Sequence, residues 1–258
     1  MSPSINLPVC LEDARIKVLP TAAFYISDFI SKEEEEVLLS KINRTNALKI
    51  QTAPKPKWKV LSHRRLQTWP SDLTKNNSLL DSPLPGWLRD PVASRLLECP
   101  MNMSNMKQHI FSDSPHGGPN HVLINEYQPG EGIMPHKDGA AYHPVVCTVS
   151  LGSSLTLEIY ETKDDGTRET TPKFRILQEP RSLLITTGEL YTDYLHGIAE
   201  VHEDVDLDHI TIANWDLLRS PEIYKQGNFQ RSTRTSLTYR DVIKVSKLGA
   251  KFSMFKAR

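Results

Sequence analysis

Residues 120–138, NHVLINEYQPGEGIMPHKD, join a strand pattern to a His-x-Asp pair across a segment rich in glycine and proline. The strand pattern is short and contains β-branched and aromatic side chains, and Asn125 and Tyr127 lie near its end. His136 and Asp138 are two positions apart. In an extended segment such side chains project to the same face, so both could bind one metal ion.

A third ligand candidate, His196, follows Asp138 by 58 positions (196 minus 138) and lies near the end of another strand pattern. Two histidines and one carboxylate are typical of non-haem Fe(II) sites that leave positions open for co-substrate and oxygen. His202 and Asp204 repeat the His-x-Asp spacing, but they stand in the acidic stretch EVHEDVDLDH, which we expect to be an exposed loop. We therefore predict a metal site at His136, Asp138 and His196.

Strand patterns dominate the C-terminal half of the chain. Eight short segments rich in β-branched and aromatic residues are separated by turn residues, namely 120–128, 145–151, 155–160, 174–178, 182–187, 190–198, 210–215 and 234–243. Their number and spacing favour an antiparallel barrel or a double-sheet jelly roll. Helices are expected over about 31–43, which begins with a Ser31/Glu34 capping box, and about 86–98. The sequence therefore predicts an α+β fold whose N-terminal helices buttress a sheet.

The domain prediction is a leader over 1–22, ending in a short strand, and one domain over 23–258. That domain divides into a helical extension over 23–119, a strand core over 120–242 and a basic tail over 243–258. Within the extension, prolines make a helix unlikely over 53–69, and 100–119 reads as a loop.

Composition gives weaker limits. The 258 residues carry a formal net charge of zero, so any basic surface for nucleic acid must be local. Three cysteines without a CxxC pair favour a reducing compartment over a disulfide framework. We see no signal peptide and no membrane span, and we expect a monomer in the cytoplasm and nucleus.

The last strand pattern contains two arginines six positions apart, Arg234 and Arg240, which alternation places on one face. A planar guanidinium binds a carboxylate through two parallel hydrogen bonds. Such an arginine suits 2-oxoglutarate, a dicarboxylate that often accompanies Fe(II) on this triad. Solvent-facing charges on an edge strand are the alternative.

The segments NEYQPGEGIMPHKD, LHGI and RTSLTYR resemble the AlkB family of Fe(II)/2-oxoglutarate dioxygenases, over most of residues 24–242. The resemblance implies a double-stranded β-helix, or jelly roll, that uses Fe(II), 2-oxoglutarate and O2. It implies that the triad binds iron, that Asn125 and Tyr127 hydrogen-bond 2-oxoglutarate, that Arg234 binds its distal carboxylate, and that Arg240 helps at the keto-acid end. Many relatives carry Asn where this chain has Ser236, and 38 positions separate His196 from Arg234, more than is usual.

Residues 53–69 are the candidate substrate lid. This stretch is basic and contains two tryptophans; the residues singled out as substrate contacts are Lys57, Trp58, Arg64 and Arg65. Basic side chains interleaved with aromatic ones suit a nucleic-acid backbone and an unstacked base. The resemblance implies oxidative demethylation or repair of alkylated DNA or RNA. A reader of methylated nucleic acid with little or no turnover and a protein hydroxylase stay open, as does a packing role for the tryptophans.

Overall fold

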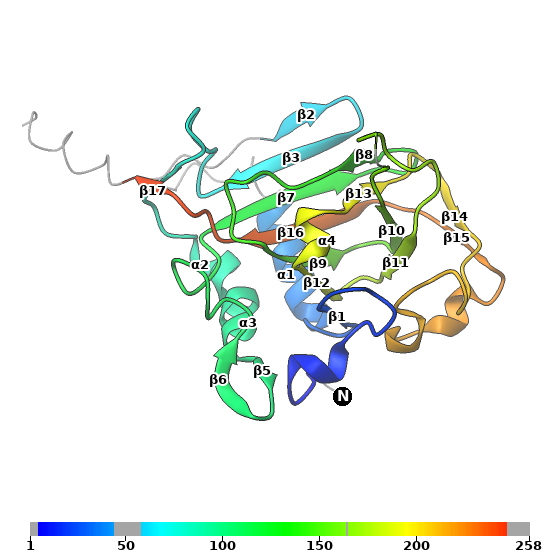
Figure 1. The fold of residues 1–258 in the computed structure, drawn as a ribbon, viewed down its shortest axis with the longest axis horizontal. Coiled ribbons are helices and arrows are strands. Elements are labelled where there is room, and N and C mark those ends of the chain that lie inside the picture. The colour runs from blue at the N-terminus through cyan, green and yellow to red at the C-terminus, as the bar shows by residue number, and fades with distance from the viewer. Residues whose placement is uncertain (1–4, 44–57, 164, 247–258) are drawn as a thin grey trace, which may run out of the picture.

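The computed structural model describes residues 5–43, 58–163 and 165–246, and two antiparallel sheets form its centre (Figure 1). The larger sheet has seven strands in the order β1 (Ala23–Ile26), β12 (Leu183–Thr187), β9 (Val145–Leu151), β16 (Arg234–Arg240), β7 (His121–Tyr127), β3 (Arg64–Trp69) and β2 (Lys59–Leu61). The smaller sheet has four, in the order β11 (Phe174–Gln178), β10 (Leu155–Tyr160), β13 (Leu195–Ile198) and β8 (Ile133–His136). Two packed antiparallel sheets form the predicted jelly roll.

Three short strand pairs lie outside these sheets. They are β14 (Glu203–Val205) with β15 (Asn228–Gln230), β4 (Leu79–Leu80) with β17 (Val245–Ser246), and β5 (Pro100–Asn102) with β6 (Asn105–His109). Single-turn helices η1 (Leu11–Ala14), α4 (Glu189–Thr192), η4 (Trp215–Leu217) and η5 (Pro221–Tyr224) fill the connections. In the part of the chain that the structure describes, every helix is too short or too polar to cross a bilayer.

Side-chain alternation gives the larger sheet two different faces. On β7, Val122 and Ile124 belong to the main hydrophobic core, whereas Asn125 and Tyr127 line a pocket on the other face. On β16, Leu237 belongs to the core and the alternating residues from Arg234 to Arg240 line the pocket. Because successive side chains on a strand point to opposite faces, one strand can both hold the fold together and carry the site.

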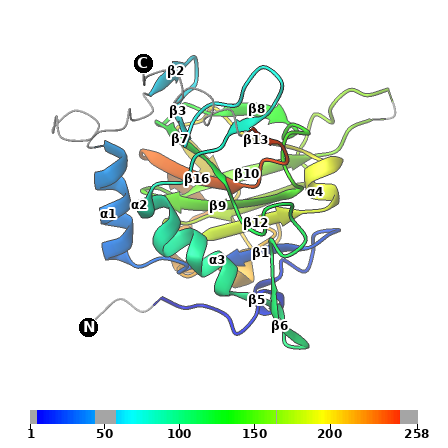
Figure 2. The ribbon, with the colours of Figure 1, turned by 90° about the vertical axis from the view of Figure 1, so that its left-hand side faces the viewer.

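Helices α1 (Lys32–Asn43), α2 (Gly86–Leu88) and α3 (Ser94–Glu98) lie against the core face of this sheet (Figure 2). The predicted capping box at α1 is present, since the Ser31 N–H donates to Glu34 Oε2 at 2.8 Å and the Glu34 N–H donates to Ser31 Oγ at 3.2 Å. Leu38 and Ile42 of α1 are 1% exposed in the core. The first predicted helix is therefore confirmed. It packs on the face of the larger sheet that is opposite the pocket.

The structure corrects several local predictions. The helix expected over 86–98 is present but kinked within Arg89–Ala93, because Asp90 precedes a proline and adopts an extended conformation. The loop expected over 100–119 contains the β5–β6 hairpin, in which Asn102 Oδ1 accepts the Asn105 N–H at 3.0 Å. Local side-chain to backbone bonds of this kind define tight turns that composition alone does not reveal.

Two more errors concern predicted strands. Segment 210–215 does not form a strand, because Asp208 Oδ1 accepts the N–H groups of Ile210 and Thr211, and the Asn214 side chain bonds both backbone groups of Leu177. Segment 190–198 forms a strand only from residue 195, because α4 occupies its beginning. In both segments, turn-forming contacts prevail over β-propensity.

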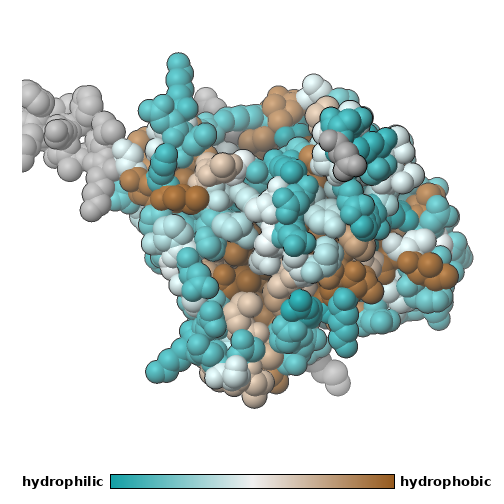
Figure 3. All heavy atoms as spheres, in the orientation of Figure 1, coloured by the Kyte–Doolittle hydropathy of each residue, from teal (hydrophilic) through white to brown (hydrophobic). Residues whose placement is uncertain are grey.

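The N-terminal part contributes more to the sheet than predicted. Strands β1, β2 and β3 all belong to the larger sheet, so the expected helical extension over 23–119 also completes the core sheet. In the expected leader, Leu11, Ile16 and Leu19 are buried. Lys57, the rest of 53–57 and residues 247–258 of the basic tail lie outside the described residues. On the surface shown in Figure 3, hydrophilic side chains predominate and apolar ones form separate groups.

Candidate active site

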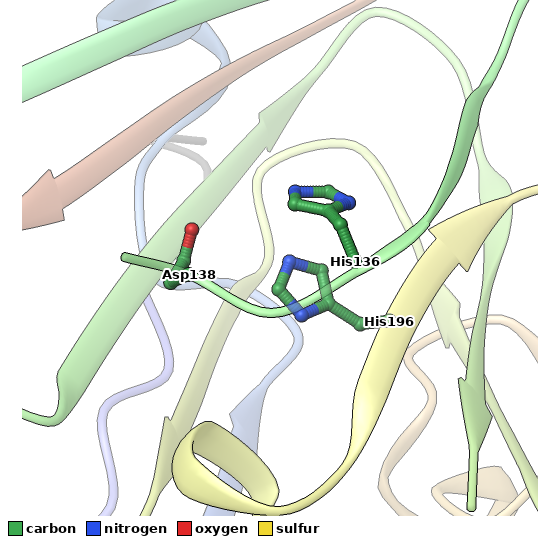
Figure 4. Close-up of side chains that lie close together, drawn as sticks. All are labelled: His136, Asp138 and His196. Carbon is green, nitrogen blue, oxygen red and sulfur yellow. The ribbon is translucent and has the colours of Figure 1, made fainter. Parts of the chain in front are cut away.

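His136, Asp138 and His196 converge at the mouth of the jelly roll (Figure 4). His136 on β8 is the direct cross-strand partner of His196 on β13, and their ring centroids are 4.5 Å apart. Asp138 follows β8 immediately. One ligand atom of each residue lies within 4.8 Å of the other two. Antiparallel pairing thus brings together side chains 60 positions apart (196 minus 136), as a facial triad requires.

Hydrogen bonding and burial prepare the two imidazoles for a metal. Nδ1 of His136 lies 2.9 Å from the carbonyl oxygen of Met134, which can only accept, so Nδ1 carries a hydrogen and Nε2 is the nitrogen left to bind a metal. Burial lowers the pKa of His196 to about 4, although Asp138 opposes this shift. His196 is therefore neutral near pH 7, and no proton has to leave before it binds a metal.

Asp138 is held by Arg240. Nη1 of Arg240 donates to Asp138 Oδ1 at 2.6 Å, and the Arg240 guanidinium lies 4.3 Å from the centre of the Tyr142 ring. The Tyr142 hydroxyl is 3.4 Å from Nδ1 of His121, whose Nε2 is 3.0 Å from the Ser71 carbonyl oxygen. The structure places Arg240 beside the carboxylate ligand Asp138, and its expected contact with the keto-acid end of 2-oxoglutarate stays a prediction.

Arg234 is a buried cation at the other end of the pocket. It is 3% exposed, and its Nε and Nη2 groups donate to Ser150 Oγ and Gln178 Oε1 at 2.7–3.1 Å. Within the described ranges, no carboxylate forms an ion pair with it. Burial lowers its pKa to about 10, which still leaves it charged at neutral pH. A buried charge of this kind needs an anion, and a ligand carboxylate is a suitable one.

Asn125 and Tyr127 line the pocket between the two arginines. The side-chain oxygen of Asn125 is buried and has no hydrogen-bond partner. This oxygen can only accept, whereas the NH2 group of the same amide can donate to a carboxylate. Tyr127 is 5% exposed; burial raises the pKa of its phenol, although Arg234 and Arg64 oppose the shift. The cavity measures about 140 Å³, and its lining includes His136 and His196 from the smaller sheet, Asp138, and Arg234 from the larger sheet.

Sequence reasoning did not assign the polar residues that hold Arg234, nor several polar residues that line the pocket. Ser150 and Gln178 hold Arg234, and Ser236, noted only as a departure from the family pattern, lines the pocket wall. Strand alternation offered a signal, since Ser150 is the cross-strand partner of Ser236 and therefore faces the same side. The pairing of β9 with β16 could not be deduced from their separate positions in the chain.

The structure separates the substrate candidates. Arg64 lines the pocket. Arg65 lies on the opposite face of β3, where Nε and Nη2 donate to Glu126 at 2.7 and 2.9 Å and the guanidinium lies 4.3 Å from the centre of the Trp58 ring. Trp58 packs against the main core. The pattern of 53–69 thus contains one arginine directed toward the pocket and one held in an ion pair.

The second His-x-Asp pair serves the fold. Glu203–Val205 is strand β14 rather than the expected loop, and Asp204 forms a buried ion pair with Arg231, with N–O distances of 2.7 and 2.8 Å. A Cβ atom on Gly130 would lie only 2.8 Å from Nε2 of His202, so the His202 ring packs closely against this glycine. Among the described residues, the only cluster with metal-binding geometry is His136, Asp138 and His196.

Comparison with known proteins agrees with this geometry. The model of the 2OG-Fe(II) oxygenase superfamily matches residues 23–240. The chain is similar to the Danio rerio protein named "Probable RNA/DNA demethylase ALKBH6", with 39% identity over 243 residues and 92% of each chain. Among solved structures it resembles OsALKBH1 (TM-score 0.50, 14% identity, 87% of this chain and 98% of that one) and a Burkholderia pseudomallei oxidoreductase of the 2OG-Fe(II) oxygenase family (0.53, 10%, 95% and 95%).

The chain therefore belongs to the 2OG-Fe(II) oxygenase superfamily, and the two structural likenesses support its jelly-roll fold. It is an Fe(II)/2-oxoglutarate-dependent dioxygenase. Within the superfamily, its identity with the Danio rerio ALKBH6 protein places it among the AlkB-type enzymes.

The pocket residues fit these cofactors. His136, Asp138 and His196 offer two imidazole nitrogens and one carboxylate, and Arg234 is a buried cation that forms no ion pair with a carboxylate of the described residues. The side-chain amide of Asn125 lines the same pocket, and its NH2 group could donate to the co-substrate. When bound, Fe(II) with 2-oxoglutarate and O2 supplies the oxidising power for attack on a C–H bond. The triad would ligate the metal and Arg234 would be the charge partner of the co-substrate, in a pocket whose apolar lining includes Ile133 and Ile198.

Proposed function

We propose that this dioxygenase oxidatively removes methyl and other alkyl groups from nucleic-acid bases. The observation that carries the proposal is the 39% identity, over nearly the whole of both chains, with a protein named as an RNA/DNA demethylase. Whether DNA or RNA is the better substrate is an outcome of the test below.

The hairpin formed by β2 and β3 supports this proposal. It lies at the edge of the larger sheet (Figure 1), and Arg64 at the start of β3 lines the pocket. The Gly132 N–H donates to the carbonyl oxygen of His63 at 3.2 Å, and His63 lies 3.3 Å from Glu200. The hairpin tip therefore contacts the segments that carry the metal ligands. A base that enters the pocket would pass this hairpin, where a cation and apolar side chains are available to it.

The proposed reaction removes an N-methyl group as formaldehyde. One oxygen atom of O2 enters the C–H bond of the N-methyl group, and the other enters 2-oxoglutarate, which loses CO2 and becomes succinate. The resulting N–CH2OH group releases formaldehyde when its C–N bond breaks and the nitrogen takes up the hydroxyl proton. The pocket needs only to hold the methyl carbon near the triad and to exclude bulk water.

The direct test incubates the full chain, Fe(II) and 2-oxoglutarate with single-stranded and duplex oligonucleotides that carry defined methylated bases. Mass spectrometry then follows loss of the methyl group, and a second assay follows formaldehyde. We expect demethylation of at least one substrate by the wild-type chain and none by His136→Ala. Equal product from both proteins would refute the proposal. Tight binding without product would instead favour a role as a reader of methylated nucleic acid.

A further inference from the structure

Three side chains form a row across the pocket face of the larger sheet. Arg234 on β16 is the cross-strand partner of Tyr127 on β7. On the other side of β7, Arg65 is paired with Glu126, and continuing this antiparallel register by one residue places Arg64 beside Tyr127. Neighbouring strands are separated by about 4.8 Å, so the backbones of the two arginines are about 10 Å apart, with the tyrosine between them.

Arg64 is directed into this pocket without a charge partner. Its side chain lines the cavity, and its Nε group is buried with no hydrogen-bond partner. No ion pair joins it to a carboxylate of the described residues, whereas its neighbours Arg65 and Lys59 pair with Glu126 and Asp72. A buried N–H group without an acceptor is costly, and it marks a position where a bound group is expected.

We propose that Arg64 is a second cation for the distal carboxylate of 2-oxoglutarate and that the β2–β3 hairpin closes over the co-substrate through this contact. The inference requires only that the enzyme uses 2-oxoglutarate, so it is independent of the nucleic-acid substrate. Arg234 approaches the carboxylate from β16, and Arg64 approaches from β3, across Tyr127.

The number of hydrogen bonds that the distal carboxylate can accept is consistent with two cationic partners. Nε and Nη2 of Arg234 are already engaged by Ser150 and Gln178, which leaves Nη1 for a ligand. A carboxylate accepts about four hydrogen bonds, so one Nη1 group and the Tyr127 hydroxyl do not saturate it. A guanidinium from the hairpin would supply the remaining donors in planar geometry. Binding of the co-substrate would then order the hairpin beside the mouth before the main substrate arrives.

Arg64→Gln and Arg65→Gln form a matched pair, because the two arginines are adjacent on one strand and point to opposite faces. The full chain is loaded with Mn(II) in place of iron, and calorimetry measures the dissociation constants of 2-oxoglutarate and of 2-oxobutanoate, which lacks the distal carboxylate. We expect Arg64→Gln to weaken 2-oxoglutarate binding about tenfold, the effect of a charge-assisted hydrogen bond at a partly buried site, and to change 2-oxobutanoate binding less than about twofold. Arg65→Gln should change neither affinity more than about twofold, but should lower the melting temperature by leaving Glu126 unpaired.

An unchanged 2-oxoglutarate affinity in Arg64→Gln would overturn the inference. If that variant instead loses affinity for oligonucleotides, the anion that Arg64 binds is a substrate phosphate and the inference is also wrong. An equal loss for both oxo acids would place the effect at the metal end and refute the contact with the distal carboxylate. If Arg64→Gln fails to fold, Arg64→Lys replaces it, because lysine keeps the charge but lacks the planar guanidinium that donates two parallel hydrogen bonds. Arg64→Lys should weaken 2-oxoglutarate binding about threefold. Wild-type affinity in this variant would refute the inference.

Discussion

The Arg234→Met variant tests whether the buried Arg234 guanidinium binds the co-substrate. In the free protein, the substitution removes three hydrogen bonds to Ser150 and Gln178, but it also removes a charge that has no carboxylate partner in the described chain. An apolar side chain of similar length fills the same space, so we expect the melting temperature of the free, Mn(II)-loaded protein to change by less than about 3 °C.

The two proteins should differ once 2-oxoglutarate is present. At a ligand concentration 100 times its dissociation constant, the wild type gains about 2.7 kcal/mol of stability, or about 5–10 °C for a chain of this size. Loss of two charge-assisted hydrogen bonds from Nη1 costs about 3 kcal/mol and weakens binding about 150-fold. At the same ligand concentration the variant then gains about 0.3 kcal/mol, or about 1 °C.

The assay is differential scanning fluorimetry or calorimetry of both proteins with and without 2-oxoglutarate, and 2-oxobutanoate serves as the control ligand. A full wild-type shift in Arg234→Met would refute the assignment of Arg234 to the distal carboxylate. A variant that melts far below the wild type without ligand would show instead that Arg234 is chiefly a structural residue.

Three further predictions concern the metal, the pH and the fold. His136→Ala should abolish succinate formation while leaving the circular dichroism spectrum unchanged; turnover within tenfold of wild type would exclude His136 as a ligand. His121 has a folded pKa of about 4 because of burial, below its unfolded value of about 6.5. The stability linked to its neutral form is therefore complete above pH 7 and falls by up to about 3 kcal/mol as the pH drops from 6.5 to 4, so His121→Asn should flatten the pH dependence in urea unfolding at pH 7.5 and 5. Asp204→Asn should cost about 3 kcal/mol of stability by leaving Arg231 buried and unpaired, and the 2-oxoglutarate affinity should stay within twofold; a stable variant would contradict this.

Local sequence patterns predicted the parts of the site that depend on a single strand. His136 and Asp138 share a face because they are two positions apart, and Arg234 and Arg240 do so for the same reason. The capping box at α1 is likewise a short-range signal. Each of these features follows from local geometry, which the sequence displays directly.

The remaining features depend on which strands become neighbours. Ser150 and Gln178 bind Arg234 only because β9 and the end of β11 meet it in the folded chain. Arg64 and Arg65 look alike in sequence, and the register of β3 on β7 decides which faces the pocket. Segment 210–215 has the composition of a strand, but side chains take the place of strand pairing. Asp208 accepts the Ile210 N–H group, and the Asn214 side chain donates to the Leu177 carbonyl oxygen. These outcomes are set by tertiary contacts, which intrinsic propensity does not encode.

The direct pairing of His136 with His196 makes the catalytic centre sensitive to insertions that leave every ligand in place. One extra residue within β8 would turn His136 to the far side of the strand, since side chains alternate, and the chain would keep its His-x-Asp motif but lose a usable site. A homologue with all three ligands and an altered strand length should therefore be suspected of inactivity. Conversely, designers who wish to silence this enzyme without removing a ligand could shift that strand by one position.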